Sequence, residues 1–179
     1  GVDIATMLDV FSRPDMTYSQ VEKAVDETID RAHISIETAG GVMLNGPIQG
    51  GLFPTLRAKS AIGMSALDFS VHPIGGIVPI MEQQKYRDLV KIMLASKSNL
   101  APNRPVHMFG CGHPMLFPML IAMGADLFDS AAYVLFARDG RLLTPWGTER
   151  ISDIEEWPII TPSVANITPS EVRAMKKQD

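Results

Sequence analysis

Asp126-Leu127-Phe128-Asp129-Ser130-Ala131-Ala132-Tyr133 is a stretch in which two carboxylates bracket an apolar pair, and the residues after Ser130 favour a helix. Residues 125–128 predict a short buried strand that ends at Asp129. Parallel α/β barrels carry their reactive groups at the carboxyl ends of the strands, so Asp129 is a candidate catalytic residue. Asp is also a preferred N-cap residue, and on these residues alone the simpler interpretation is that Asp129 caps the following helix.

Four further apolar segments precede this one, each followed by a helical pattern. The predicted strands are 4–8, 42–48, 69–74, 105–109 and 125–128, and the predicted helices are 18–36, 54–65, 81–95, 115–122 and one starting at Ser130. Such alternation favours a parallel sheet covered by helices. A complete (β/α)8 barrel takes about 250 residues. The predicted fold class is therefore α/β, an incomplete TIM-type barrel of about five βα units, although the pattern does not distinguish a barrel from an open sheet.

Two regions are expected in the chain. Residues 1–138 hold the βα units, and residues 139–179 form a turn-rich segment with a short terminal helix. That helix is marked by a capping-box pattern from Thr168 to Glu171, and Lys176 and Lys177 are expected near its end.

The composition narrows the class of protein. No apolar run reaches the roughly 18 residues that a membrane span needs, so a cytoplasmic protein without a membrane partner is expected. The single Cys111 of this 179-residue chain cannot form an internal disulfide or a thiolate metal site by itself. A formal net charge of −4 gives no general attraction to nucleic acid, so any RNA binding must be local.

Each predicted strand ends in residues that could contact a ligand. In chain order they are Asp9, Gln49-Gly50-Gly51, Gly75-Gly76, Phe109-Gly110 and Asp129. The carboxyl ends of parallel strands share one edge, and a carboxylate, an amide, exposed backbone and an aromatic ring together suit a planar heterocycle. Taken singly, the paired glycines are better explained as turns.

Four blocks of sequence resemble the tRNA-guanine transglycosylases of the archaeosine type, in the same order as in that family. They are Gly46-Pro47-Ile48-Gln49-Gly50-Gly51, Pro73-Ile74-Gly75-Gly76-Ile77-Val78-Pro79-Ile80-Met81-Glu82, Arg104-Pro105-Val106-His107-Met108-Phe109-Gly110-Cys111-Gly112-His113-Pro114, and Asp126 to Tyr133. The resemblance implies a TIM barrel that replaces guanine in tRNA by a 7-deazaguanine base.

The resemblance also implies roles for the residues at the strand ends. Asp129 falls on the nucleophile that attacks the ribose C1′ and holds the RNA covalently. The implied base-binding residues are Asp9, Gln49, Gly50, Gly75, Gly76, Ile77 and Phe109. The target base must leave its stack to reach such a pocket.

Two departures from the family pattern limit what the resemblance implies. The family's general acid/base lies in an earlier Thr-Asp-Ser-Gly-Gly-like loop, so the N-terminal half of the barrel, in the same or another chain, is an expected partner. The family's three zinc-binding Cys are replaced by Ile159, Thr161 and Val164, so no metal and no cofactor are expected, with apolar packing of Trp157, Ile159 and Ile160 in place of zinc.

Two functions therefore remain open. One is base exchange with tRNA and guanine or a 7-deazaguanine as substrates; this chain alone would then be nearly inactive. The other is a non-catalytic subunit or paralogue that binds tRNA or the base. In either case the unpaired edge strands of an incomplete barrel predict a homo- or hetero-oligomer.

Overall fold

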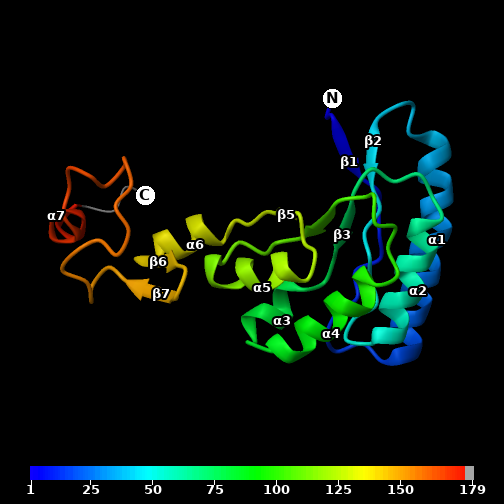
Figure 1. Ribbon diagram of the computed structural model, residues 1–179, viewed down its shortest axis with the longest axis horizontal. Coiled ribbons are helices and arrows are strands. Elements are labelled where there is room, and N and C mark those ends of the chain that lie inside the picture. The colour runs from blue at the N-terminus through cyan, green and yellow to red at the C-terminus, as the bar shows by residue number, and fades with distance from the viewer. Residues whose placement is uncertain (176–179) are drawn as a thin grey trace. The chain divides into compact units, whose positions relative to one another are not determined.

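The computed structural model describes residues 1–175, which form a mixed α/β structure (Figure 1). The chain divides into two compact units: the first comprises residues 1–111 and 119–129, and the second comprises residues 112–118 and those from Ser130 onward. Within the described residues, no helix is both long enough and apolar enough to cross a membrane.

Parallel strands form the centre of the first unit. They are β1 (Ile4–Thr6), β2 (Met43–Asn45), β3 (His72–Ile74), β4 (Val106–Met108) and β5 (Leu127–Phe128). β1 pairs with β2, and β3, β4 and β5 pair in that order, all parallel. Two parallel bridges, Asn45–Val71 and Ile48–Ile74, connect the two sets. The strands therefore follow one another in chain order, which confirms the predicted parallel βα arrangement.

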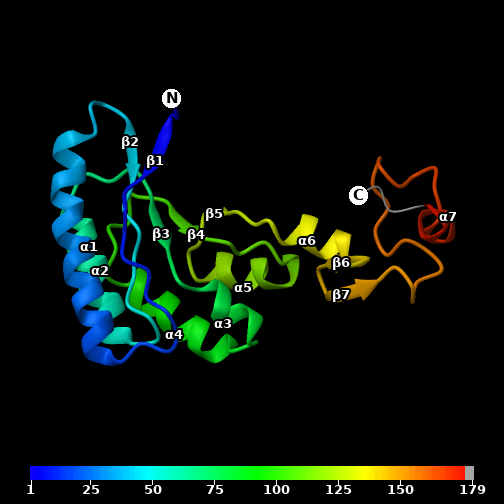
Figure 2. The same cartoon turned by 180° about the vertical axis from the view of Figure 1, so that it is seen from behind.

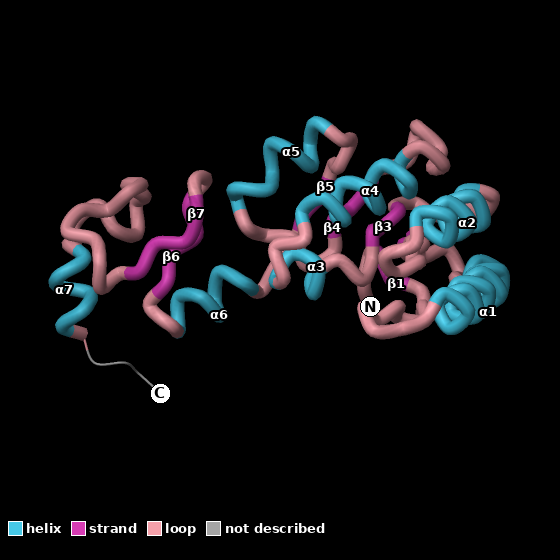
Figure 3. Tube along the Cα trace, turned by 90° about the horizontal axis from the view of Figure 1, so that it is seen from below, coloured by secondary structure: helices cyan, strands magenta, loops and turns pink. Residues whose placement is uncertain are grey.

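Helices follow each of these strands. They are α1 (Tyr18–Thr38), α2 (Pro54–Ser65), α3 (Val78–Glu82), α4 (Tyr86–Lys97), the 3₁₀-helix η1 (Pro114–Leu116) and α5 (Phe117–Ala122). Figure 3 shows α1, α2 and α4 along one side of the strands, and α1 and α2 lie next to each other in the view of Figure 2. Val21, Val25 and Leu56 are buried where α1 meets α2. One apolar stripe on each helix thus faces its neighbours and the strands.

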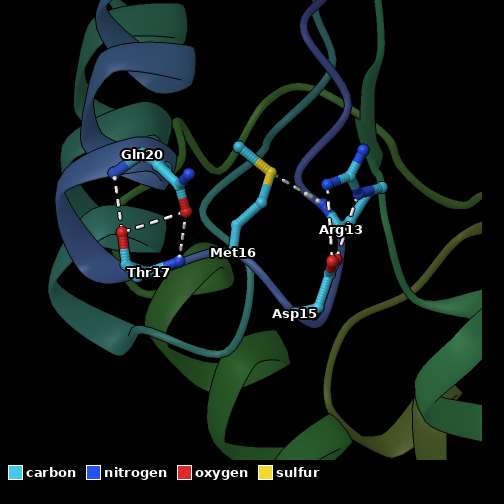
Figure 4. Close-up of polar contacts among 5 residues, drawn as sticks. All are labelled: Arg13, Asp15, Met16, Thr17 and Gln20. Atoms are coloured by element: carbon cyan, nitrogen blue, oxygen red, sulfur yellow. Dashed lines mark hydrogen bonds and ion pairs between the residues drawn. The ribbon is translucent and has the colours of Figure 1, made fainter.

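The start of α1 is fixed by the turn that follows β1 (Figure 4). Thr17 and Gln20 form the predicted capping box: the Gln20 amide donates to Thr17 Oγ1, and the Thr17 amide donates to Gln20 Oε1 at 2.8 Å. In the preceding turn Arg13 and Asp15 form an exposed ion pair, and the Met16 amide donates to the Arg13 carbonyl. The two capping-box bonds satisfy amides that the start of a helix leaves free.

Two helices differ from the sequence expectation. The helix predicted over 81–95 is two helices, α3 and α4, because Gln84 adopts a positive φ of 54° and ends the first one. α3 also begins earlier than predicted, with Pro79 in its first turn, a position that suits proline. The helix predicted over 115–122 begins as the 3₁₀ turn η1 and becomes α-helical at Phe117.

The second unit contains a hairpin that the sequence did not predict. The elements of this unit after Ser130 are α6 (Ala132–Arg138), β6 (Arg141–Thr144), β7 (Gly147–Arg150) and α7 (Pro169–Ala174), and β6 and β7 form the hairpin. β6 and β7 pair antiparallel, and the guanidinium of Arg141 stacks over the Phe136 ring, 3.8 Å from its centroid. α7 has the capping box predicted for Thr168 and Glu171.

Polar contacts hold the segment between β7 and α7. Trp157 Nε1 donates to the Ile167 carbonyl, and Arg173 donates to the carbonyls of Ile151 and Ile154 at 2.7 Å each. The expected apolar packing of Ile159 and Ile160 with Trp157 is wrong, since Ile160 is 75% exposed and Ile159 is 44% exposed. The expected extension of the terminal helix to Lys176 and Lys177 lies outside the described residues.

Candidate functional site at the carboxyl ends of the parallel strands

Strand register aligns most of the predicted site residues. Ile48, Ile74, Met108 and Phe128 pair with one another across neighbouring strands. The next residues along the chain are Gln49, Gly75, Phe109 and Asp129, in that order. Four separate parts of the sequence therefore deliver their site residues to the same edge of the sheet, where parallel α/β structures bind ligands.

Asp9 and Gln49 form a hydrogen-bonded pair at this edge. Gln49 Nε2 donates to Asp9 Oδ2 at 2.6 Å, and Gln49 Oε1 accepts from the Ser12 amide at 3.3 Å. Gln49 is only 2% exposed, whereas Asp9 is partly exposed. The amide is thus fixed from both ends by the chain itself, and Asp9 Oδ1 has no partner among the described residues.

Gly75 and Gly76 lie directly against the Gln49 side chain. A Cβ on Gly75 would lie 2.4 Å from Gln49 Nε2, and one on Gly76 would lie 3.3 Å from Gln49 Oε1. Gly76 has a φ of 69°, which favours glycine. The N–H groups of Gly76 and Ile77 donate no hydrogen bond within the part of the chain that is described. Gly76 is half-buried and Ile77 is fully buried, so the Gly76 N–H is the available backbone donor beside the Asp9–Gln49 pair.

Gly50 and Ile77 shape the two loops from below. Gly50 has a φ of 141°, and a Cβ there would come within 2.6 Å of the Arg57 amide nitrogen, so only glycine lets the loop pass the start of α2. Ile77 is fully buried and precedes α3 as its N-cap residue. Its side chain therefore anchors the loop, and its backbone is buried as well.

Asp129 accepts a hydrogen bond from the loop that follows the neighbouring strand β4. The Gly110 amide donates to Asp129 Oδ1 at 2.9 Å, and the carboxylate side chain is 55% exposed. α6 begins at Ala132 with Ala131 as its N-cap, so the simpler interpretation of Asp129 as the capping residue is wrong. At the other end of β5, just before its first residue, Asp126 Oδ2 accepts a hydrogen bond from the Val106 amide at 2.8 Å.

His107 is a neighbour of Asp129 that the sequence reasoning missed. Its Nε2 lies 2.9 Å from Asp129 Oδ1, although the angle at Nε2 is not that of a hydrogen bond and the nitrogen is otherwise unpartnered. The Phe109 ring packs edge-on against the His107 ring, with 4.7 Å between centroids. Alternate residues of a strand share a face, so the position of His107 two residues before Phe109 was the available signal.

Arg57 is a second residue that was missed. It is fully buried and donates to three backbone carbonyls of the loops that follow β2 and β3. Burial lowers the pKa of Arg57 to about 9, so the guanidinium stays charged at neutral pH. Arg57 belongs to the buried stripe of α2 with Leu56, Ser60 and Met64, and this helical spacing could have revealed it.

An apolar hollow of about 460 Å³ lies elsewhere in the first unit. It is lined by β1, β2 and the end of α1, including Val2, Ala5, Met7 and Leu44, and by none of the predicted site residues. The described residues contain no cluster of three or more His, Cys, Asp or Glu that could hold a metal ion. The side chains of Ile159 and Val164 offer no donor atom, so this segment does not fit the family's zinc.

Comparison with known proteins agrees with this arrangement. The sequence profile of the family described as queuine tRNA-ribosyltransferase matches residues 1–176. A tRNA-guanine(15) transglycosylase of Thermococcus onnurineus is 45% identical over the whole chain, which covers 31% of that protein. Proteins of the same name from Methanocaldococcus jannaschii and Pyrococcus furiosus are 45% and 42% identical, and the chain covers 28% and 30% of their lengths. This chain spans less than a third of these relatives, and it belongs to the queuine tRNA-ribosyltransferase family, as the four sequence blocks indicated.

Proposed function

We propose that this chain supplies the nucleophile and the base-recognition edge of a tRNA-guanine transglycosylase, which replaces guanine in tRNA by a 7-deazaguanine. The observation that carries the proposal is the alignment of Gln49, Gly75, Phe109 and Asp129 at the ends of four paired strands. Relatives named tRNA-guanine(15) transglycosylase support the same reaction.

Asp129 acts as the nucleophile in this proposal. Oδ1 faces the Gly110 amide and His107, whereas Oδ2 has no partner among the described residues and is free to attack. A bond forms between Oδ2 and the ribose C1′ as the bond from C1′ to guanine breaks. The incoming base then displaces the carboxylate while its ring N–H proton passes to the group that protonated guanine, and two displacements retain the configuration at C1′.

The Asp9–Gln49 pair and the neighbouring backbone recognise the base. Asp9 Oδ1 can accept N–H groups from the edge of guanine, and the free amide of Gly76 can donate to its ring carbonyl. Phe109, packed on His107, provides an apolar wall. We propose no resident metal or cofactor, because Ile159, Thr161 and Val164 replace the family's thiolates.

The leaving guanine needs a proton, and we propose that the N-terminal part of a TIM-type barrel supplies the donor. This part would also cover β1, which pairs on one side only within residues 1–175. Ile4 in this strand is 47% exposed, an unusual exposure for an apolar residue of a parallel sheet, and Val2 and Leu8 on either side of the strand are 64% and 74% exposed. The five strands would then be part of one barrel, in a cytoplasmic protein or complex that binds tRNA.

A non-catalytic tRNA-binding or base-binding paralogue is the second candidate. The absence of the family's zinc ligands favours it. The geometry around Asp129 favours the enzyme, since a carboxylate with one oxygen held by an amide and the other free is arranged for attack.

Radiolabelled guanine and unmodified tRNA provide the test. The chain is incubated with both, alone and mixed with the N-terminal part of a relative's barrel. Label should enter tRNA only in the mixture and be lost with Asp129→Asn, while Asp68→Asn, which changes an 84% exposed carboxylate, should behave as wild type. Bound tRNA without exchange in every mixture would establish the paralogue instead.

A further inference from the structure

Arg57 connects the two loops that carry the proposed base contacts. Its Nε donates to the Gly51 carbonyl at 3.0 Å, and its Nη1 donates to the carbonyls of Ile48 and Gly75 at 2.8 Å each. These carbonyls lie on either side of Gln49 and immediately before Gly76. A single planar group therefore fixes both loops from beneath, which a lysine ammonium cannot reproduce.

Ser60 reaches the same region from the next turn of α2. Its Oγ accepts a hydrogen bond from the Gln49 amide at 3.1 Å, and the residue is fully buried. Residues three apart on a helix face the same way, so Arg57 and Ser60 act on the loops together. The Ser60 bond holds the backbone of the residue whose side chain pairs with Asp9.

Fold stability alone does not explain a buried arginine here. Arg57 has no carboxylate partner within the described part of the chain, and its Nη2 is buried without an acceptor. A buried charge without a counter-ion and an unsatisfied N–H both cost free energy, and an apolar side chain of similar volume would avoid both costs. A specific demand at the loops accounts for keeping it.

We infer that Arg57 and Ser60 are positioning residues: they hold the loops after β2 and β3 so that Gln49 and the Gly76 backbone meet the base together. The inference rests on the proposed function for what the loops bind, but not for how the loops are held. Neither residue touches the reacting atoms.

Hydrogen exchange tests the positioning directly. Arg57→Lys keeps the charge but loses the planar donors, so exchange of the Gln49 and Gly75 amides should become about tenfold faster or more, the factor for about 1.4 kcal/mol. Ser60→Ala should accelerate hydrogen exchange of the Gln49 amide and leave that of the Gly75 amide unchanged. Ser96→Ala is the matched control, because Ser96 is equally buried but bonds only to Ile92 in its own helix.

Uniform acceleration in Arg57→Lys, as large in α4 as at Gln49 and Gly75, would overturn the inference, since it would mean only a less stable fold. If Arg57→Lys does not fold, Ser60→Ala decides, because it removes one hydroxyl: unchanged exchange at Gln49 would refute the positioning role.

Binding of labelled guanine, measured by equilibrium dialysis, separates the inference from the proposed function. Arg57→Lys should weaken binding about tenfold while Ser96→Ala matches wild type. Loops that loosen with no change in guanine affinity would overturn the role in base recognition. Failure of the wild-type chain to bind guanine would count against the proposed function. Hydrogen exchange of the Gln49 and Gly75 amides would still decide whether Arg57 holds the loops.

Discussion

Gly75→Ala should destabilise the first unit through a single contact with Gln49. The φ of Gly75 suits any residue, so alanine meets no backbone strain there, but its Cβ would lie 2.4 Å from Gln49 Nε2 and 3.1 Å from Cδ. The amide group must move. Because Gln49 is buried, movement breaks its bonds to Asp9 and to the Ser12 amide.

The size of the effect follows from these two bonds. The bond to the Asp9 carboxylate contributes about 1.5–3 kcal/mol and the bond from Ser12 about 0.5–1.5 kcal/mol. Replacing glycine by alanine restores about 0.4–1 kcal/mol by restricting the unfolded chain. The expected net loss is therefore about 1–4 kcal/mol, with a centre of about 2.5 kcal/mol.

A double-mutant cycle read by urea unfolding provides the assay. In a Gln49→Ala background the clash is absent and the bonds are already gone, so Gly75→Ala should be neutral or slightly stabilising. The coupling between the two positions should then equal the worth of the two bonds, about 2–4.5 kcal/mol, far above the few tenths expected for independent sites. An equal loss from Gly75→Ala in both backgrounds would refute the proposed contact.

Three further predictions concern other parts of the chain. Asp129→Asn should change the free energy of unfolding by less than about 0.5 kcal/mol, because the side chain is 55% exposed, yet abolish a covalent tRNA adduct on denaturing gels; an adduct in the variant would exclude Asp129 as nucleophile. Burial lowers the pKa of His72, so the unfolded chain takes up a proton that the folded chain resists, and stability should fall as pH drops below about 6.5. His72→Gln should lack this component in urea unfolding at pH 7.5 and 5.5, and an unchanged pH dependence would assign it to other groups. Thr17→Ala removes the capping box of α1 and should cost about 1 kcal/mol in thermal unfolding; Ser19→Ala, one residue inside the same helix, is the control, and equal losses would argue against the cap.

Local signals in the sequence identified much of the first unit. Thr17 and Pro54 mark the starts of α1 and α2, and both helices begin where these residues predict. The break between α3 and α4 has no such signal, because Gln84 is a residue type with no strong preference for a positive φ. The β6–β7 hairpin was missed because its strands mix charged and apolar residues without a regular alternation.

The sequence predicts the location of the candidate site residues better than their contacts. The strand ends indicated which residues share an edge, but not that Gln49 bonds to Asp9, 40 residues earlier in the chain. Arg57 was not considered because charged side chains are usually exposed. His107 was not considered because its partner, Asp129, comes from another strand. Spacing along the sequence places Arg57 in the buried stripe of α2 and His107 on the same face as Phe109, but the partners of these side chains depend on the packing of distant segments.

The two carboxylates that bracket β5 together fix the register in which β5 pairs with β4. β5 has only two residues, and a strand so short could slip along β4 by one position, turning Asp129 toward the opposite face of the sheet. Asp126 accepts a hydrogen bond from the amide of Val106, the first residue of β4. Asp129 accepts one from the amide of Gly110, two residues after the end of β4. Either slip would break both bonds at once. Asp129 therefore helps to set the register of the strand that carries it, so a pairing error would cost free energy during folding itself.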